Sequence, residues 1–127
     1  MLLVEDNDLN AEIAATILED DGAYVSIAGD GAQAVEAFTA NPEGTFDAIL
    51  MDVVMPKMDG LAATRAIRAL DRPDAASIPI IAMTGNAFQE DVRECLEAGM
   101  NAHLAKPIDV AKAEHVIAKV MAGVRPH

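Results

Sequence analysis

Short apolar runs alternate along this chain with segments in which apolar residues recur every three or four positions. The apolar runs predict five strands, at about 2–5, 24–28, 47–51, 79–83 and 101–105. A helical pattern follows each run after a short connection. Elements that alternate in this way form parallel strands joined by right-handed crossovers, so we predict an α/β fold with helices on both faces of one sheet.

The helical segments carry start and stop signals. In the first, Leu9, Ile13 and Ile17 share one face, with Ala14 and Leu18 beside it. Asn7 or Asp8 can cap the start of this helix by accepting a bond from a free N–H. The second is built on Ala34, Val35 and Phe38 and ends at Asn41-Pro42, and the third is built on Leu61, Thr64, Ile67 and Leu70 and ends at Arg72-Pro73. The fourth is built on Phe88, Val92, Cys95 and Leu96 and ends at Gly99. The fifth is built on Val110, Ala113, Ile117 and Val120, with Asp109 as its cap. Each segment is therefore predicted to be one amphipathic helix.

The character of the apolar runs predicts the order of the strands. The run 24–28 alternates polar and apolar residues, as an edge strand does, whereas 47–51 and 79–83 are mostly apolar and fit central positions. Five strands are too few for a closed barrel of eight. We therefore predict an open, doubly wound, five-stranded parallel sheet in the order 2-1-3-4-5, with its binding crevice between the carboxyl ends of strands 1 and 3.

Three carboxylates stand where the first and third runs end. Glu5 and Asp6 follow the first run, and Asp52 follows the third. Any one of them alone could be a solvated loop acid, but their shared placement at strand ends predicts a cluster. Two unit charges about 4 Å apart repel by roughly 4 kcal/mol at an effective dielectric near 20, so such a cluster either holds protons or binds a cation. Mg²⁺, which prefers hard oxygen ligands and keeps several waters, fits a small open cluster better than Ca²⁺.

Asp52 is the best candidate for a nucleophile, because it ends a central strand with apolar residues behind it. A carboxylate can attack phosphorus when a metal neutralises the developing oxygen charge, which gives an aspartyl phosphate. Lys106 precedes Pro107 and is held in extended geometry, so its ammonium can reach the same phosphoryl group. Thr84, after the fourth run, offers a hydroxyl to a phosphoryl oxygen. Together these residues predict a cation-assisted phosphoryl site.

Composition narrows the class of protein. With 127 residues, 52% of them hydrophobic, the chain is expected to form one domain over residues 1–127, and its single cysteine, Cys95, is interpreted as packing. A formal charge of −12 argues against direct binding of nucleic acid or anionic membranes. No apolar run approaches the ~20 residues of a membrane span, and no signal peptide is recognisable, so we expect a cytoplasmic domain. Met1 falls almost on the first strand, which suggests a piece of a longer protein.

Several short motifs follow one another along the chain, namely Val4-Glu5-Asp6-Asn7, Met51-Asp52-Val53-Val54-Met55-Pro56 continuing to Met58-Asp59-Gly60, Met83-Thr84-Gly85, Glu97-Ala98-Gly99-Met100 and Lys106-Pro107. By these motifs, and over essentially its whole length, the chain resembles the receiver domains of two-component response regulators, which have a flavodoxin-like fold. The sequence after the first strand and the sequence around Lys106 look most like those of receivers attached to hybrid sensor histidine kinases. A free-standing receiver and one from a DNA-binding regulator stay open as alternatives.

The resemblance implies a set of roles. Asp52 would accept a phosphoryl group from a phosphohistidine. Mg²⁺ would be bound directly by Asp6, by Asp52 and by the backbone carbonyl of Val54, and through water by Glu5. The domain would not be a classical enzyme, although it would promote its own phosphorylation and dephosphorylation.

The resemblance also implies that Lys106 and Thr84 hold the phosphoryl oxygens and that phosphorylation switches a surface near the fourth helix and fifth strand. His103 stands where the family commonly has Tyr or Phe, so a switch by an aromatic side chain coupled to Thr84 stays open. Our hypothesis is that His103 moves inward on phosphorylation, and the alternative is a half-exposed histidine without this role. Gly85 replaces the usual alanine after Thr84, which loosens that loop. The expected partner is a histidine kinase or histidine phosphotransfer domain, which would bind to this surface and to the first helix. A homodimer can also form through the fourth helix, the fifth strand and the fifth helix.

Three other functions fit the sequence less well. Residues 29–34 fit the dinucleotide pattern G-x-G-x-x-A, but they follow a predicted edge strand, and Asp30-Gly31 is explained as a turn that opens a helix. No P-loop sequence is present. A Mg²⁺-dependent aspartyl phosphatase needs a second acid to activate water, and Val54 stands two residues after Asp52 instead. A degenerate docking domain would lack an acceptor or metal ligand, whereas every expected group is present.

Overall fold

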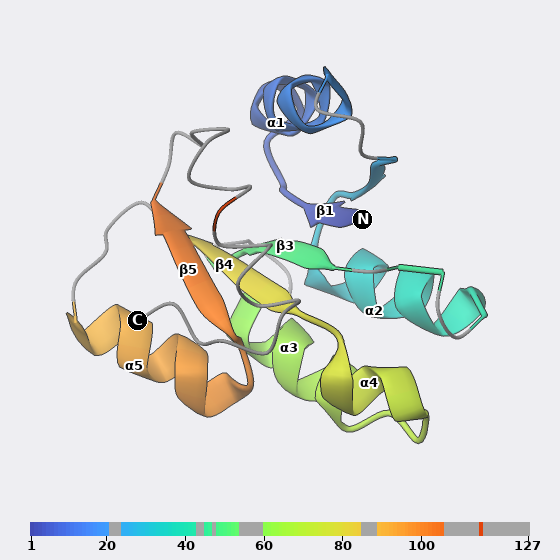
Figure 1. Ribbon diagram of the computed structural model, residues 1–127, viewed down its shortest axis with the longest axis vertical. Coiled ribbons are helices and arrows are strands. Elements are labelled where there is room, and N and C mark those ends of the chain that lie inside the picture. The colour runs from blue at the N-terminus through green and yellow to red at the C-terminus, as the bar shows by residue number, and fades with distance from the viewer. Residues whose placement is uncertain are drawn as a thin grey trace.

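The structure is a computed structural model that describes residues 1–20, 24–42, 45–46, 48–53, 60–84, 89–105 and 115. Strands and helices alternate through these residues (Figure 1). No helix in the described part of the chain is long and apolar enough to cross a bilayer. The elements, in chain order, are β1 (Leu2–Val4), α1 (Asp8–Asp20), β2 (Ser26–Ala28), α2 (Gly31–Ala40), β3 (Ile49–Asp52), α3 (Gly60–Arg68), α4 (Pro73–Ser77), β4 (Ile80–Thr84), α5 (Gln89–Ala98) and β5 (Ala102–Ala105).

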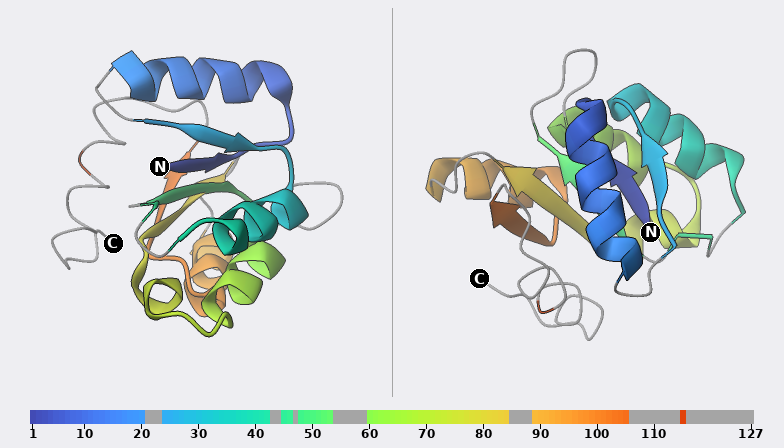
Figure 2. Two further views of the ribbon diagram at one scale, coloured as in Figure 1. Left: turned by 90° about the vertical axis from the view of Figure 1, so that its right-hand side faces the viewer. Right: turned by 90° about the horizontal axis from the view of Figure 1, so that it is seen from above.

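The strands form one parallel sheet in the order β2-β1-β3-β4-β5, which confirms the predicted order. Figure 2 shows α1 on one face of this sheet and α2, α3 and α5 on the other. β1 pairs with β3 so that Val4 lies opposite Met51. The next residues along the two strands, Glu5 and Asp52, are therefore neighbours at the carboxyl edge of the sheet.

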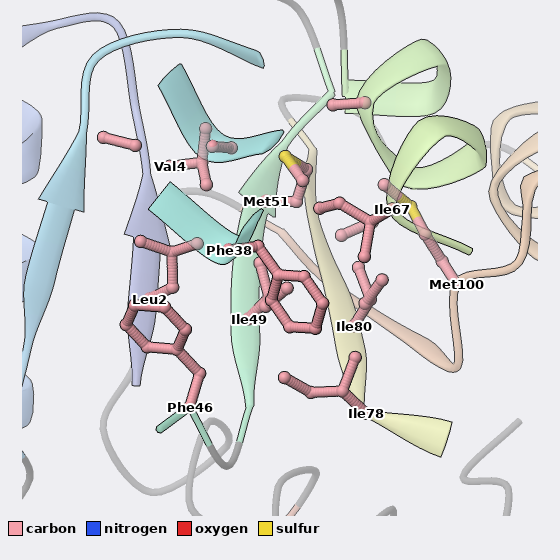
Figure 3. Packing of buried hydrophobic residues seen from close by; sticks show 14 of the residues in the cluster. Leu2, Val4, Phe38, Phe46, Ile49, Met51, Ile67, Ile78, Ile80 and Met100 are labelled. Carbon is pink, nitrogen blue, oxygen red and sulfur yellow. The ribbon is translucent and has the colours of Figure 1, made fainter. Parts of the chain in front are cut away.

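Each face of the sheet has its own hydrophobic cluster, because successive strand residues point to opposite faces. On the face covered by α2 and α3, Phe38 and Ile67 pack with Leu2, Ile49 and Ile80 (Figure 3). The other cluster joins strand residues Leu3, Leu50, Ile81, Met83, Ala102 and Leu104 to the α1 residues Ala14, Ala15 and Leu18. β1, β3 and β4 are buried on both faces, as central parallel strands are.

α1 buries a different side from the one that its large apolar residues suggest. Leu9 and Ile13 are 65% and 50% exposed, and Ile17 is half-buried. The residues that face the sheet are Ala11, Ala14, Ala15 and Leu18. Small side chains let the helix lie close to the sheet, so the apolar periodicity identifies the helix but not its buried face. An apolar stripe is left on the outer side of α1.

Several helix boundaries follow the sequence signals. Asp30 caps α2 by accepting a 2.8 Å bond from the Gln33 N–H, which confirms that residues 29–34 open a helix. Gly99, with φ 111°, follows the end of α5 as predicted. The helix predicted to run to Arg72-Pro73 is shorter, because α3 ends at Arg68 and leaves Leu70 outside it. Pro73 instead starts the short helix α4, where the N–H that proline lacks has no partner within the helix to lose. Of the predicted helix after Asp109, only residue 115 is described.

Candidate functional site

Three carboxylates meet at the carboxyl edge of the sheet, as the sequence predicts. Glu5, Asp6 and Asp52 each place one carboxylate oxygen within 4.8 Å of the other two. Glu5 and Asp52 are only 4% and 3% exposed, whereas Asp6 is exposed. Two acids are therefore withdrawn from water, and the third lies at the opening of the site.

The acids that follow β1 are fixed by the start of α1. The Glu5 N–H donates to the Ala28 carbonyl at 3.1 Å, which ties the end of β1 to β2. The Glu5 carboxylate accepts a 3.2 Å bond from the Asn7 N–H. The Asn7 side chain in turn accepts a 3.0 Å bond from the Asn10 N–H and caps α1, which decides the predicted choice between Asn7 and Asp8. The helix cap and the acidic pair thus share one turn.

Asp52 is held from the other side, by β4 and α3. It is the last residue of β3 and lies opposite Met83 in β4. The next peptide continues this pairing, because the Val53 N–H donates to the Met83 carbonyl at 3.2 Å. The Val53 carbonyl accepts a 3.0 Å bond from the N–H of Gly60, the first residue of α3. The chain on the far side of Asp52 is therefore bonded to both neighbouring elements.

The site has the chemistry of a divalent cation site. Carboxylate oxygens are hard ligands, and burying two carboxylates beside a third is costly unless opposite charge compensates them. Mg²⁺ commonly takes one or two carboxylates and keeps several waters, which the exposed side at Asp6 allows. The donor set therefore fits Mg²⁺, and the same cation can neutralise oxygens of a phosphoryl group that approaches Asp52.

The structure describes some of the other predicted site residues and not others. Thr84 ends β4, one residue beyond the partner of Asp52, so its backbone reaches the same edge of the sheet. His103 is half-buried in β5 and pairs with Ala82. Lys106 and Val54 lie outside the described residues, as do Gly85 and Pro107. The described part of the site is therefore its acidic half.

Sequence reasoning did not single out Gly60 beyond its place in a motif. A Cβ built on Gly60 would collide with the carbonyl oxygen of Asp52 and would lie 2.9 Å from the Val53 Cα. Gly60 is thus the residue at which α3 touches the backbone of the candidate nucleophile. The signal in the sequence was a glycine within the first turn of a helix, where glycine is a poorer helix former than almost every other residue.

The site can be compared with known proteins. The family model described as response regulator receiver domain matches residues 1–118. Sensor protein GacS of Pseudomonas syringae pv. syringae is 41% identical over 120 residues, which are 94% of this chain and 13% of that protein. Hybrid signal transduction histidine kinase B of Dictyostelium discoideum is 41% identical in an alignment of 117 positions, and the match covers 85% of this chain and 6% of that protein. The chain thus corresponds to a small part of these relatives.

Two solved structures are informative. The receiver domain of sensor histidine kinase PA1611 from Pseudomonas aeruginosa PAO1, solved with a magnesium ion in its active site cleft, is 41% identical, with a TM-score of 0.83 and 95% of each chain covered. The second is the co-crystal structure of the Saccharomyces cerevisiae histidine phosphotransfer protein Ypd1 with the receiver domain of its downstream response regulator Ssk1. A chain of that structure is 29% identical to this one, with a TM-score of 0.83, and the match covers 95% of this chain and 87% of that chain. The fold thus has close structural counterparts, one of which holds a magnesium ion in its active site cleft.

Proposed function

The chain belongs to the response regulator receiver domain family of two-component phosphorelay signalling, and from that membership we propose that Asp52 accepts a phosphoryl group from a phosphohistidine in a Mg²⁺-dependent transfer. The observation that carries this proposal is the convergence of three carboxylates, two of them buried, at the ends of adjacent strands. The test is a phosphoryl adduct on the intact protein that requires both Mg²⁺ and Asp52. Phosphate release without an adduct would instead favour a phosphatase.

The proposed transfer needs little covalent chemistry from the protein. An oxygen of the Asp52 carboxylate forms a bond to phosphorus as the bond from phosphorus to the donor imidazole breaks, and the imidazole nitrogen keeps the electron pair. Asp6, Asp52 and the Val54 carbonyl would hold Mg²⁺ directly and Glu5 would hold it through water, and the bound cation would neutralise charge on the phosphoryl oxygens. Because Asp52 is buried and anchored on a central strand, its carboxylate is presented in one orientation.

Lys106 and Thr84 are proposed to bind the phosphoryl oxygens, since Thr84 ends β4 and Lys106 follows the last residue of β5 in the sequence. Lys106 would supply a point charge and Thr84 a hydroxyl donor. The added charge of the phosphoryl group would then bias a two-state surface around α5 and β5. We also propose that the chain can form a homodimer through α5, β5 and the segment after Asp109. Its proposed location is the cytoplasm, as part of a larger sensor protein.

His103 is proposed to act as the switch residue. It lies two residues before Ala105, which pairs with Thr84, so a movement of Thr84 changes its surroundings. We expect Mg²⁺ with beryllofluoride, a phosphoryl mimic, to shift the His103 ring resonances in NMR spectra. The exposed His115 serves as the internal control and should not shift. Identical His103 signals with and without the mimic would rule out this switch.

The phosphodonor is proposed to dock on the outer side of α1. Leu9 and Ile13 are exposed apolar residues on the helix that begins two residues after Asp6, so a partner seated there reaches the acidic cluster. The partner that fits the proposed transfer is a histidine kinase or histidine phosphotransfer domain, the class that the Ypd1 complex represents.

Truncating Leu9 and Ile13 to alanine should slow phosphotransfer from a phosphorylated histidine phosphotransfer domain by roughly 5–30-fold, because interface anchors typically contribute 1–2 kcal/mol. Phosphorylation by acetyl phosphate, which needs no docking, should keep the wild-type rate. Tyr24→Ala is the matched control, since Tyr24 is 93% exposed but precedes β2 at the opposite end of the sheet. Equal loss with both donors would place the effect in the site rather than on the docking surface.

A further inference from the structure

Gly60 begins α3 in direct contact with the backbone of Asp52. A Cβ at this position would collide with the Asp52 carbonyl oxygen and would lie 2.9 Å from the Val53 Cα and 3.0 Å from the Asp52 carbonyl carbon. All three neighbours are backbone atoms, so no flexible side chain can move aside to make room. Among the described glycines only Gly99 has a positive φ. The requirement for glycine at position 60 is therefore one of space, not of backbone conformation.

α3 is anchored so firmly that it cannot simply withdraw from Asp52. The Gly60 N–H donates to the Val53 carbonyl at 3.0 Å, and the hydroxyl of the fully buried Thr64 donates to the Gly60 carbonyl at 2.7 Å. Ile67, also fully buried, fixes the last turn of the helix in the core. At the far end, the Arg68 guanidinium donates to the Gly99 carbonyl at 3.0 Å.

The opposite half of the acidic cluster has separate anchors. Glu5 is tied to Ala28 through its backbone and to Asn7 through its carboxylate. A displacement at the contact with α3 would therefore move Asp52 relative to Glu5 and Asp6 rather than move the three acids together.

We propose that Gly60 is a positioning residue, whose missing side chain lets α3 press on the Asp52 backbone and set the distance between Asp52 and the acids of β1. This inference deepens the proposed function and rests on it. Mg²⁺ demands near-ideal octahedral geometry, and a misplacement of about 1 Å can reduce a reaction rate by roughly a hundredfold. Small shifts at this contact should therefore register in metal affinity and phosphorylation before they register in the fold.

The test is Gly60→Ala, studied for Mg²⁺ affinity by calorimetric titration, for phosphorylation rate at saturating Mg²⁺, and for urea unfolding. We expect the Mg²⁺ dissociation constant to rise by about tenfold or more and the rate to fall by up to about a hundredfold. Ile67→Val and Ile67→Ala are the controls, since they weaken the same helix from its core side and bracket the loss of stability. These controls should retain wild-type Mg²⁺ affinity while folded.

Thr64→Val provides a second, independent perturbation should Gly60→Ala fail to fold. It removes the hydroxyl that bonds the Gly60 carbonyl but adds no atom at the contact. A smaller rise in the Mg²⁺ dissociation constant supports the proposal, and an unchanged constant in this folded variant overturns it. Unchanged affinity and rate in folded Gly60→Ala likewise overturn it, as does an equal loss of affinity in the Ile67 controls. A wild-type protein that binds no Mg²⁺ and forms no adduct overturns the proposed function itself.

Discussion

Asp52→Asn is expected to abolish the phosphoryl adduct that the wild-type protein forms with Mg²⁺ and a phosphodonor, with a fall in rate of more than about a thousandfold. An amide cannot supply the anionic oxygen that attacks phosphorus, although asparagine has nearly the same shape as aspartate. The variant should therefore remain folded. Intact-mass spectrometry after incubation with acetyl phosphate, and again with a phosphorylated histidine phosphotransfer domain, measures the effect, and EDTA should remove the wild-type adduct.

Asp30→Asn is the matched control for this substitution. Asp30 is also a buried aspartate near the end of a strand, but it caps α2 and lies outside the acidic cluster. Asparagine is an equally good cap, so this variant should be phosphorylated like wild type. An adduct of undiminished yield on Asp52→Asn would show that another residue accepts the phosphoryl group, and fragmentation of the adduct would identify it.

Much of the fold could be predicted because its signals are local. The apolar runs at the central strands and the turn residues at the helix ends fix the alternation of elements, and the alternating polarity of residues 24–28 marks β2 as the edge. The predicted strand ends differ from the observed ones by one or two residues. The ends of an element are less regular than its middle, so the sequence carries little signal for the exact terminal residue. The order of strands then follows from which runs are buried on both faces.

Two features of the fold could not be predicted from local pattern. The outer stripe of α1 contains Leu9 and Ile13, and an average over side-chain hydrophobicity assigns such residues to the core. The actual choice depends on how close α1 can approach the sheet, which small residues such as Ala14 and Ala15 decide. Likewise, Arg72-Pro73 predicts the end of one helix, but the structure ends α3 already at Arg68, and the start of a further helix at Pro73 depends on the packing of α4.

The acidic cluster was predictable because topology alone brings it together. Once β1 and β3 are adjacent and parallel, Glu5, Asp6 and Asp52 must meet at one edge. The role of Gly60 was not predictable, because it depends on the distance between a helix start and a strand carbonyl. Sequence patterns report which residues share an edge, whereas the spacing within the site is a property of tertiary packing.

Asp6→Asn is expected to raise the Mg²⁺ dissociation constant by at least about tenfold, because it removes a proposed direct ligand, and the loss of outer-shell partners alone costs metal sites about 10–100-fold. Asp6 is the exposed member of the cluster, so its substitution leaves no cavity in the core. Removing one of three neighbouring negative charges should also raise the free energy of unfolding in EDTA, by about 1 kcal/mol. Affinity should be measured by calorimetric titration and stability by urea unfolding.

Asp8→Asn separates a ligand effect from a general charge effect. Asp8 is an exposed acid only two residues away, in the first turn of α1, and its substitution changes the net charge by the same amount. If Asp6 binds Mg²⁺, Asp8→Asn leaves the dissociation constant close to wild type, and its phosphorylation stays Mg²⁺-dependent with the same midpoint. If both substitutions weaken Mg²⁺ affinity equally, the effect comes from the net charge around the site and Asp6 is not a direct ligand. Removing a direct ligand should cost more affinity than removing a nearby charge that does not touch the cation.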